Sequence, residues 1–241
     1  MPGMPAQGGG ERSKVTGKLN FEAVLLDMDG TLLDTERVYF KALVGALAAH
    51  GFTDDVGALC HAMVGLPGPE CEAMLIARYG EAFPLAELSR SYAVKRDEIL
   101  RAGLPLKHGA IELLDALQEA EFPMAIVTSS SRQTAETYLT LAGIRKHFRT
   151  MLTRDDVARG KPHPDLYLAA AEQLRMKPHL CVAVEDSNPG VASAHAAGAI
   201  TIMVPDFVPP SPESRERCVA VLPDLIAVLE KLQLDIGGAR R

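Results

Sequence analysis

Short apolar runs that alternate with helical segments constrain the fold of this chain more than any other feature. The runs have the length of buried strands, and the segments between them carry apolar residues at helical spacing, as in Gly109–Glu121. Strands that are apolar throughout and alternate with helices indicate a parallel sheet covered on both faces, an α/β fold. The predicted strands are Ala23–Asp27, Met124–Thr128, Thr150–Thr153, Leu180–Glu185, Ala199–Val204 and Val219–Leu222.

A long, mostly helical stretch from Thr35 to Leu104 separates the first predicted strand from the second. Breaks at Gly51–Asp54, Gly65–Glu70 and Gly80–Pro84 divide it into three or four helices. We therefore expect a core formed by residues 20–34 and 105–236, with a helical insertion at 35–104. The other predicted helices are Gly109–Glu121, Gln133–Ala142, Pro164–Arg175, Pro189–Ala197 and Leu225–Leu232.

Composition limits the classes of partner. The chain has 241 residues, 47% of them hydrophobic, which is enough for a large core. Its net charge of −6 comes with no basic run, so nothing indicates a nucleic-acid partner, and no apolar stretch approaches the ~20 residues of a membrane span. Residues 1–19 lack a signal-peptide pattern and are expected to be a disordered leader, with a disordered tail at 237–241. Four cysteines without a CxxC pair favour a cytoplasmic location.

Polar side chains follow several predicted strands at the point where each strand ends. Because the carboxyl ends of parallel strands meet at one edge of the sheet, we expect these side chains to converge there. Each alone has an ordinary explanation as a turn, a helix cap or a surface lysine. The residues are Asp27 and Asp29 after the first strand, Thr128 and Ser129 after the second, Lys161 after the third, and Glu185 and Asp186 after the fourth.

The two acids after the first strand, Asp27 and Asp29, pose a problem of charge. Burying a carboxylate is costly, and two like charges so close need a cation, a proton or strong hydrogen bonds. The rest of the sequence must indicate which of these is present.

Four stretches in this order resemble the motifs of the haloacid dehalogenase-like superfamily. They are "DMDGTLLDTE", "VTSSSR", "GKPHPDLY" and "VEDSNPGVASAHAAG", and they span Asp27 to Gly198. The helical insertion directly after the first motif resembles the α-helical cap of the phosphatase and β-phosphoglucomutase branch. The resemblance implies a Rossmann-like core, a cap, Mg²⁺ and phosphoryl transfer through an aspartyl phosphate.

The resemblance also implies roles for individual residues, and the residue types suit them. Asp27 is expected to be the nucleophile, and Asp29 the acid that protonates the leaving alkoxide and then accepts a proton from water. Mg²⁺ is expected to bind Asp27, the backbone carbonyl of Asp29 and Asp186. Glu185, ranked below Asp186, is expected to bind the metal directly or through water.

Phosphate binding is expected to involve Thr128, Ser129 and Lys161, the last through a fixed positive charge. The expected partner is a small phosphate ester, such as a sugar phosphate or a nucleoside or pseudouridine monophosphate. Family resemblance makes a monomer the expected state.

Two alternatives remain open: a phosphosugar mutase of the same fold, and a non-enzymatic receiver-like module that is phosphorylated on an aspartate. A mutase holds a second phosphate under the cap, which favours an arginine there. Gly68 stands where the mutase branch has this arginine, and Tyr39 where it has a histidine. Hydrolysis is therefore favoured. Three cap cations offer substitutes for the missing charge, namely Arg37, Lys41 and Arg78.

Overall fold

The computed structural model describes residues 19–63 and 68–233 of the chain. Its strands are β1 (Ala23–Leu26), β2 (Met124–Val127), β3 (Thr150–Leu152), β4 (Cys181–Glu185), β5 (Ile200–Met203) and β6 (Ala220–Val221). They form one six-stranded sheet in the order β3-β2-β1-β4-β5-β6, and all neighbouring strands pair in parallel. Each strand lies within a predicted apolar run, so the predicted parallel sheet is confirmed.

The strand order reverses between β1 and β4. From β1 the chain builds outward to β2 and β3 on one side, and from β4 to β5 and β6 on the other. Leu25 of β1 lies opposite Ala125 of β2 and Ala183 of β4. In open parallel sheets, ligands bind beyond the carboxyl ends of the strands at the point where the order reverses. The residues that follow β1 and β4 therefore share the expected crevice.

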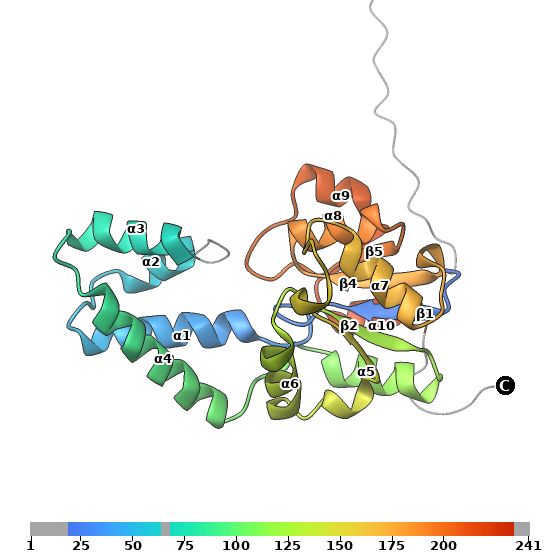
Figure 1. The fold of residues 1–241 in the computed structure, drawn as a ribbon, viewed down its shortest axis with the longest axis horizontal. Coiled ribbons are helices and arrows are strands. Elements are labelled where there is room, and N and C mark those ends of the chain that lie inside the picture. The colour runs from blue at the N-terminus through green and yellow to red at the C-terminus, as the bar shows by residue number, and fades with distance from the viewer. Residues whose placement is uncertain (1–18, 64–67, 234–241) are drawn as a thin grey trace, which may run out of the picture.

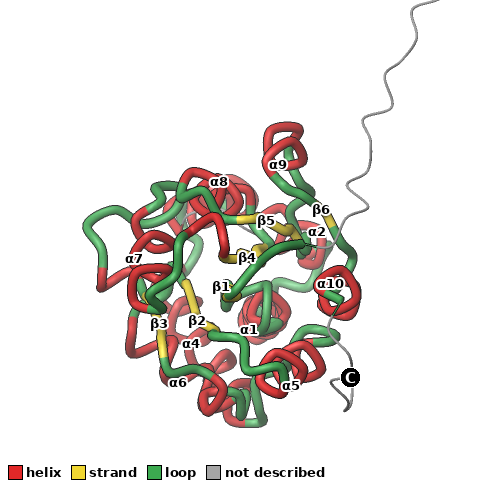
Figure 2. Tube along the Cα trace, turned by 90° about the vertical axis from the view of Figure 1, so that its right-hand side faces the viewer, coloured by secondary structure: helices red, strands yellow, loops and turns green. Residues whose placement is uncertain are grey.

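Helices cover both faces of the sheet. Helices α5 (Ala110–Glu119) and α10 (Leu225–Leu232) lie on one side, and α7 (Asp165–Gln173) and α8 (Asn188–Ala196) on the other (Figure 2). Val24 and Leu26 of β1 belong to the apolar cluster on the first side, which also includes residues of α6 (Arg132–Leu141). Leu25 belongs to the cluster on the second side, because successive side chains of a strand point to opposite faces.

The core contains one α-helix that the sequence analysis did not predict, α9 (Pro212–Arg217). Its cap, Ser211, accepts a hydrogen bond from the backbone N–H of Ser214, and Pro212 occupies the first turn. Serine followed by proline is a known helix start, so the signal was present. Pro164, predicted within the first turn of α7, instead precedes that helix. Three short 3₁₀ helices complete the core: η1 (Arg145–His147), η2 (Arg154–Asp156) and η3 (Pro178–Leu180).

The helical insertion forms a cap beside the carboxyl ends of the strands, to the left of the sheet in Figure 1. The described residues place four helices there, within the predicted three or four: α1 (Thr35–Ala49), α2 (Val56–Met63), α3 (Gly68–Tyr79) and α4 (Leu85–Arg101). Most of their apolar side chains form a cluster of their own, while Val38 of α1 and Leu100 of α4 belong to the cluster on the first side of the sheet. Gly51 and Gly80, which end α1 and α3, have φ angles of 83° and 93° that favour glycine.

The chain enters and leaves the cap side by side. Leu33 and Leu106 form an antiparallel bridge, and the N–H of Lys107 donates to the carbonyl of Leu32 at 2.9 Å. The predicted leader apart from Leu19, the predicted tail and residues 65–67 of the predicted cap loop lie outside the described residues. Within the described part of the chain, no helix combines the length and apolar character that crossing a membrane requires.

Candidate active site

The sheet brings the predicted polar residues together from four segments of the chain. The Nζ of Lys161, in the loop before α7, lies 2.5 Å from an oxygen of Asp27 after β1. The same nitrogen lies 2.5 Å from Oε1 of Glu185, the last residue of β4. The hydroxyl of Thr128, after β2, donates to Asp29 at 3.4 Å. The predicted convergence at one edge of the sheet is present.

Lys161 is the cation at the centre of this cluster. Its side chain is 5% exposed, and its Nζ also donates to the carbonyl of Val127 at 2.9 Å. Burial lowers the pKa of the Lys161 ammonium, but the charges of Asp27 and Glu185 outweigh burial and raise it above the usual value. Lys161 therefore keeps its proton and offers a fixed positive charge.

The acids around Lys161 are more crowded than one lysine can offset. Burial raises the pKa of Asp27 to about 7, although the charge of Lys161 opposes this rise. Burial and the charges of Asp27 and Glu185 raise the pKa of Asp186 to about 9. Without a further cation, burial and mutual repulsion therefore favour the protonated forms of these carboxyl groups.

The donor set at this cluster fits a divalent metal ion. One carboxylate oxygen from each of Asp27, Glu185 and Asp186 lies within 4.8 Å of the others. Carboxylate oxygens are the ligands that Mg²⁺ and Ca²⁺ prefer. Gly30 packs directly against this cluster. Its φ of +80° favours glycine, and any side chain would clash there, because an added Cβ would lie 2.3 Å from Oδ2 of Asp186. The residues present therefore fit the expected metal.

Glu185 is held by protein groups on both of its oxygens. Its Oε1 accepts from the hydroxyl of Tyr167 at 2.6 Å and contacts Lys161, and its Oε2 accepts from Ser187 at 3.2 Å. Gly190 of α8 lies so close that an added Cβ would overlap the Glu185 carboxylate. Glu185 is fully buried. Asp186 has fewer protein partners among the described residues, and its Oδ1 accepts a hydrogen bond from Thr31 at 3.5 Å.

Asp29 lies among hydroxyl groups. Its Oδ2 accepts from Ser130 at 2.8 Å and from Thr128, while its Oδ1 is buried without a hydrogen-bond partner. Burial raises the pKa of Asp29, and the hydrogen bonds of Ser130 only partly oppose this rise. A carboxyl group with a raised pKa and one unpartnered oxygen is suited to carry and donate a proton.

The three serines after Thr128 have different positions, which the run "TSSS" does not reveal. Ser129 is exposed, whereas Ser130 reaches Asp29. Ser131 caps α6, since its side chain accepts from the N–H of Thr134. The cap of this helix is therefore Ser131, and neither Thr128 nor Ser129. Ser130 is a site residue that the sequence analysis missed, because spacing alone does not say which hydroxyl turns inward.

A second ion pair near the site was also missed. Lys107, where the chain returns from the cap, lies 2.7 Å from Asp206 in the loop after β5. The other oxygen of Asp206 is buried without a partner, and it lies 3.5 Å from the Cβ position of Gly30. This pair joins the cap connection to the core beside the acidic cluster. No motif in "VPDF" marks Asp206.

Comparison with known proteins identifies relatives of this chain. A family model described as haloacid dehalogenase-like hydrolase matches residues 21–198. The chain is 35% identical to hexitol phosphatase A of Escherichia coli over 181 residues, 75% of this chain and 81% of the relative. It is 33% identical to a probable pseudouridine-5'-phosphatase of Saccharomyces cerevisiae over 245 residues, 90% of this chain and 97% of the relative.

Among solved structures, the fold resembles that of a HAD family hydrolase from Deinococcus radiodurans R1 with bound phosphate and sodium. The TM-score is 0.78 and the sequence identity is 29%, over 90% of this chain and 99% of the other. The similarity thus extends over both the sheet and the inserted helices.

Proposed function

This chain belongs to the haloacid dehalogenase-like hydrolases and is a phosphoric monoester hydrolase. We propose that it uses Mg²⁺ and forms an aspartyl-phosphate intermediate. The observation that carries the proposal is the position of Asp27. It contacts Lys161, and one of its oxygens lies within 4.8 Å of an oxygen of Asp186, a spacing that suits two ligands of one metal ion. A carboxylate beside a fixed cation and a metal site is arranged to approach a phosphate dianion.

In the proposed first step, an Asp27 oxygen attacks phosphorus, a P–O bond forms, and the bond from phosphorus to the ester oxygen breaks. Asp29 gives its proton to the departing alkoxide, a role supported by its raised pKa and its unpartnered Oδ1. In the second step, water attacks phosphorus and Asp29 takes one proton from that water. The bond to Asp27 then breaks, which releases inorganic phosphate and restores both acids.

Thr128, Ser129 and Lys161 bind the phosphoryl oxygens in this proposal. The support is the position of Thr128 beside Asp29 and of Lys161 beside Asp27, which places a hydroxyl and a positive charge next to the two proposed catalytic acids. Ser130 orients Asp29 through its 2.8 Å hydrogen bond. Charge-assisted donors of this kind stabilise the negative charge that spreads over the transferring group.

Mg²⁺ would be held by Asp27, the backbone carbonyl of Asp29 and Asp186, with Glu185 bound directly or through water. When bound, the ion supplies positive charge that offsets the repulsion among these acids and the phosphate dianion. Burial, together with the charges of the neighbouring acids, raises the pKa values of Asp27 and Asp186, and this supports the assignment.

The proposed substrates are small phosphate esters, either sugar phosphates or nucleoside or pseudouridine monophosphates. The names of the relatives support both classes. The test is a panel of phosphate esters with Mg²⁺, followed by release of inorganic phosphate. Beryllofluoride or aluminium fluoride should be trapped at Asp27. If no ester on the panel yields Mg²⁺-dependent phosphate, the proposal fails.

A cytoplasmic location and a monomeric state complete the proposal. The support for the location is the lack of a CxxC pair in the sequence, together with the free thiols of Cys60, Cys181 and Cys218. Sedimentation of the purified protein tests the monomer.

A phosphosugar mutase remains the second candidate, since its catalytic residues would be the same. Gly68, in the place of the mutase arginine, is an exposed residue at the start of α3. Tyr39, in the place of the mutase histidine, shares a hydrogen bond with Tyr138. The test supplies β-glucose 1-phosphate with catalytic β-glucose 1,6-bisphosphate. Glucose 6-phosphate formed faster than inorganic phosphate would establish the mutase instead.

The receiver-like alternative is wrong. Receiver modules have the strand order 2-1-3-4-5, whereas this sheet has the order β3-β2-β1-β4-β5-β6. The family and the named phosphatase relatives also identify an enzyme.

A further inference from the structure

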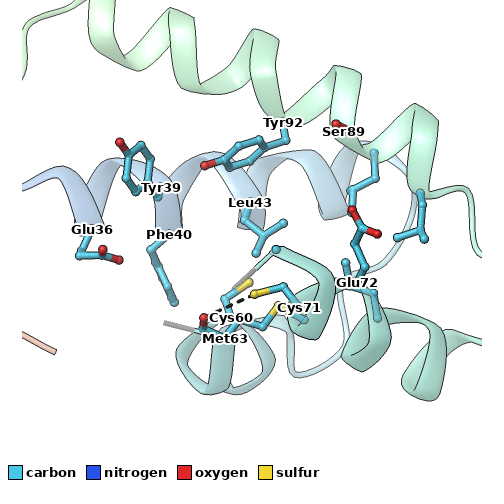
Figure 3. Close-up of a pocket in the computed structure, with 14 residues that line it drawn as sticks. Glu36, Tyr39, Phe40, Leu43, Cys60, Met63, Cys71, Glu72, Ser89 and Tyr92 are labelled. Carbon is cyan, nitrogen blue, oxygen red and sulfur yellow. Dashed lines mark hydrogen bonds between the residues drawn. The ribbon is translucent and has the colours of Figure 1, made fainter. Parts of the chain in front are cut away.

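The cap contains a cavity of about 470 Å³ between its four helices (Figure 3). Most of its lining is apolar or aromatic, with Phe40 and Leu43 from α1, Leu75 from α3, and Tyr92 from α4. A cavity of this size is large enough for the leaving group of a small phosphate ester. The catalytic cluster accounts for the phosphate end of a substrate but not for this space.

Glu36, in the first turn of α1, lies at the end of the cavity nearest the core. Figure 3 shows its carboxylate at one end and Glu72 and Ser89 at the other. Glu36 is half-buried and makes no hydrogen bond or ion pair with any described residue. A carboxylate facing a cavity without a partner is an acceptor available to a ligand.

Nothing among the described lining residues provides positive charge, since none is Lys, Arg or His. The cap cations that the sequence analysis named are directed elsewhere. Arg37 is 63% exposed and lies 3.8 Å from Asp34. Arg78 donates to the carbonyl of Asp54, and Lys41 is exposed.

The surroundings of Glu36 also repel negative charge. The pKa of Glu36 is raised by burial and then by the charges of Asp206, Asp29 and Asp34. An anionic group on a substrate would meet these same charges in addition to that of Glu36. The segment from Asp29 to Glu36 is short and contains a bridge between Asp29 and Leu33, so this end of the cavity is the one nearer the proposed proton donor.

We propose that the cap cavity receives the leaving group and that Glu36 selects its charge. Glu36 accepts a hydrogen bond from an uncharged, hydroxyl-bearing leaving group and excludes one that carries a carboxylate or a second phosphate. This inference rests on the proposed phosphatase function, which it narrows to esters of neutral polyols and sugars.

Two esters with the same carbon chain test the proposal. Glucitol 6-phosphate ends in a CH₂OH group, and 6-phosphogluconate ends in a carboxylate. The measurement is kcat/KM for phosphate release from each, and the informative quantity is their ratio. We expect the wild type to favour glucitol 6-phosphate by tenfold or more, because like charges held close together in an enclosed site repel strongly. Glu36→Gln should lower that ratio about tenfold, by removing the charge while keeping the shape.

Glu70→Gln is the matched control. Glu70 is an exposed carboxylate on the same cap and does not line the cavity, so its removal should leave the ratio unchanged. Glu36→Ser is a second variant that also removes the charge, in case Glu36→Gln does not fold. A wild type that prefers 6-phosphogluconate overturns the inference, as does an unchanged ratio in an active Glu36 variant. If the wild type releases phosphate from neither ester nor from p-nitrophenyl phosphate, the phosphatase proposal itself fails.

Discussion

The catalytic cluster and the cap cavity differ in how completely their polar groups are paired. In the cluster, Lys161 contacts Asp27 and Glu185, and Glu185 is also held by Tyr167. In the cavity, Glu36 has no described partner. A buried group with several partners, such as Lys161 or Glu185, loses several interactions when it is replaced, whereas an unpaired group at a cavity wall loses few. The proposed catalytic residues are therefore held by several neighbours, whereas the cavity wall at Glu36 is open to substitution.

The apolar packing shows the same division. The cap has its own apolar cluster, in which the rings of Phe52, Tyr79 and Phe83 lie 4.5–5.2 Å apart. The sheet is packed by two other clusters. Because the cap packs largely on its own cluster, and joins the core cluster through residues such as Val38 and Leu100, a change inside one cluster should leave most of the other part folded. The four predictions below test this comparison, in order of decreasing effect.

Asp27→Asn should reduce turnover by about 10⁴-fold or more while the protein remains folded, because an amide is a poor nucleophile. Steady-state phosphate release and circular dichroism measure the two properties. Asp34→Asn, at a neighbouring acid whose nearest cation is Arg37, should stay within about threefold of wild type. Substantial turnover in a verified Asp27→Asn preparation would rule out the covalent mechanism.

Removal of the metal should abolish turnover, and Mg²⁺ should restore it. Ca²⁺ should inhibit, because its longer bonds and looser coordination misplace the nucleophile. Asp186→Ala should raise the Mg²⁺ concentration for half-maximal activity by about 100-fold. The thermal shift produced by Mg²⁺ should weaken in parallel, which provides a readout independent of activity.

Glu185→Gln is the comparison for the metal experiment. Because protein groups hold both Glu185 oxygens, this variant should change the Mg²⁺ requirement much less than Asp186→Ala does. An equal increase in both variants would instead make Glu185 a direct ligand. An unchanged requirement in Asp186→Ala would move the metal site elsewhere.

Gly190→Ala and Gly57→Ala compare the packing of core and cap. An added Cβ at Gly190 would lie 1.9 Å from a Glu185 oxygen, so this variant should lower the free energy of unfolding by about 1–3 kcal/mol. Gly57, in α2 of the cap, has no atom within 4 Å of that position, so its replacement should raise the free energy by about 0.4–1 kcal/mol. Urea denaturation measures both. Equal effects would contradict the difference in packing.

Tyr39→Phe should produce the smallest effect. It removes the 3.2 Å hydrogen bond between the hydroxyls of Tyr39 in the cap and Tyr138 in α6 of the core. The expected loss in the free energy of unfolding is about 0.5–1.5 kcal/mol. Tyr138→Phe should cost a similar amount, and the double variant should cost less than the sum of the two. Additive losses would show that this bond does not join cap and core.

Local patterns were enough to predict most of the elements. Every strand was predicted, because an apolar run of four or five residues depends on neighbours in the sequence. The helix breaks at Gly51 and Gly80 were also local, since the backbone angles there favour glycine. The helix α9 was missed although Ser211 and Pro212 marked its start, because the segment is short and polar.

The sequence by itself determined the parallel sheet, the helical insertion and the set of polar residues at the strand ends. Only the tertiary structure decided which of them touch. Lys161 and Asp27 are 134 positions apart, and their contact depends on the placement of β1 between β2 and β4. The choice of Ser130 over Ser129 and the pairing of Lys107 with Asp206 depend on side-chain directions within a few ångströms. Periodicity reports which face of an element is buried, but a hydrogen bond requires a partner at about 3 Å, and strand order and loop conformation supply that partner.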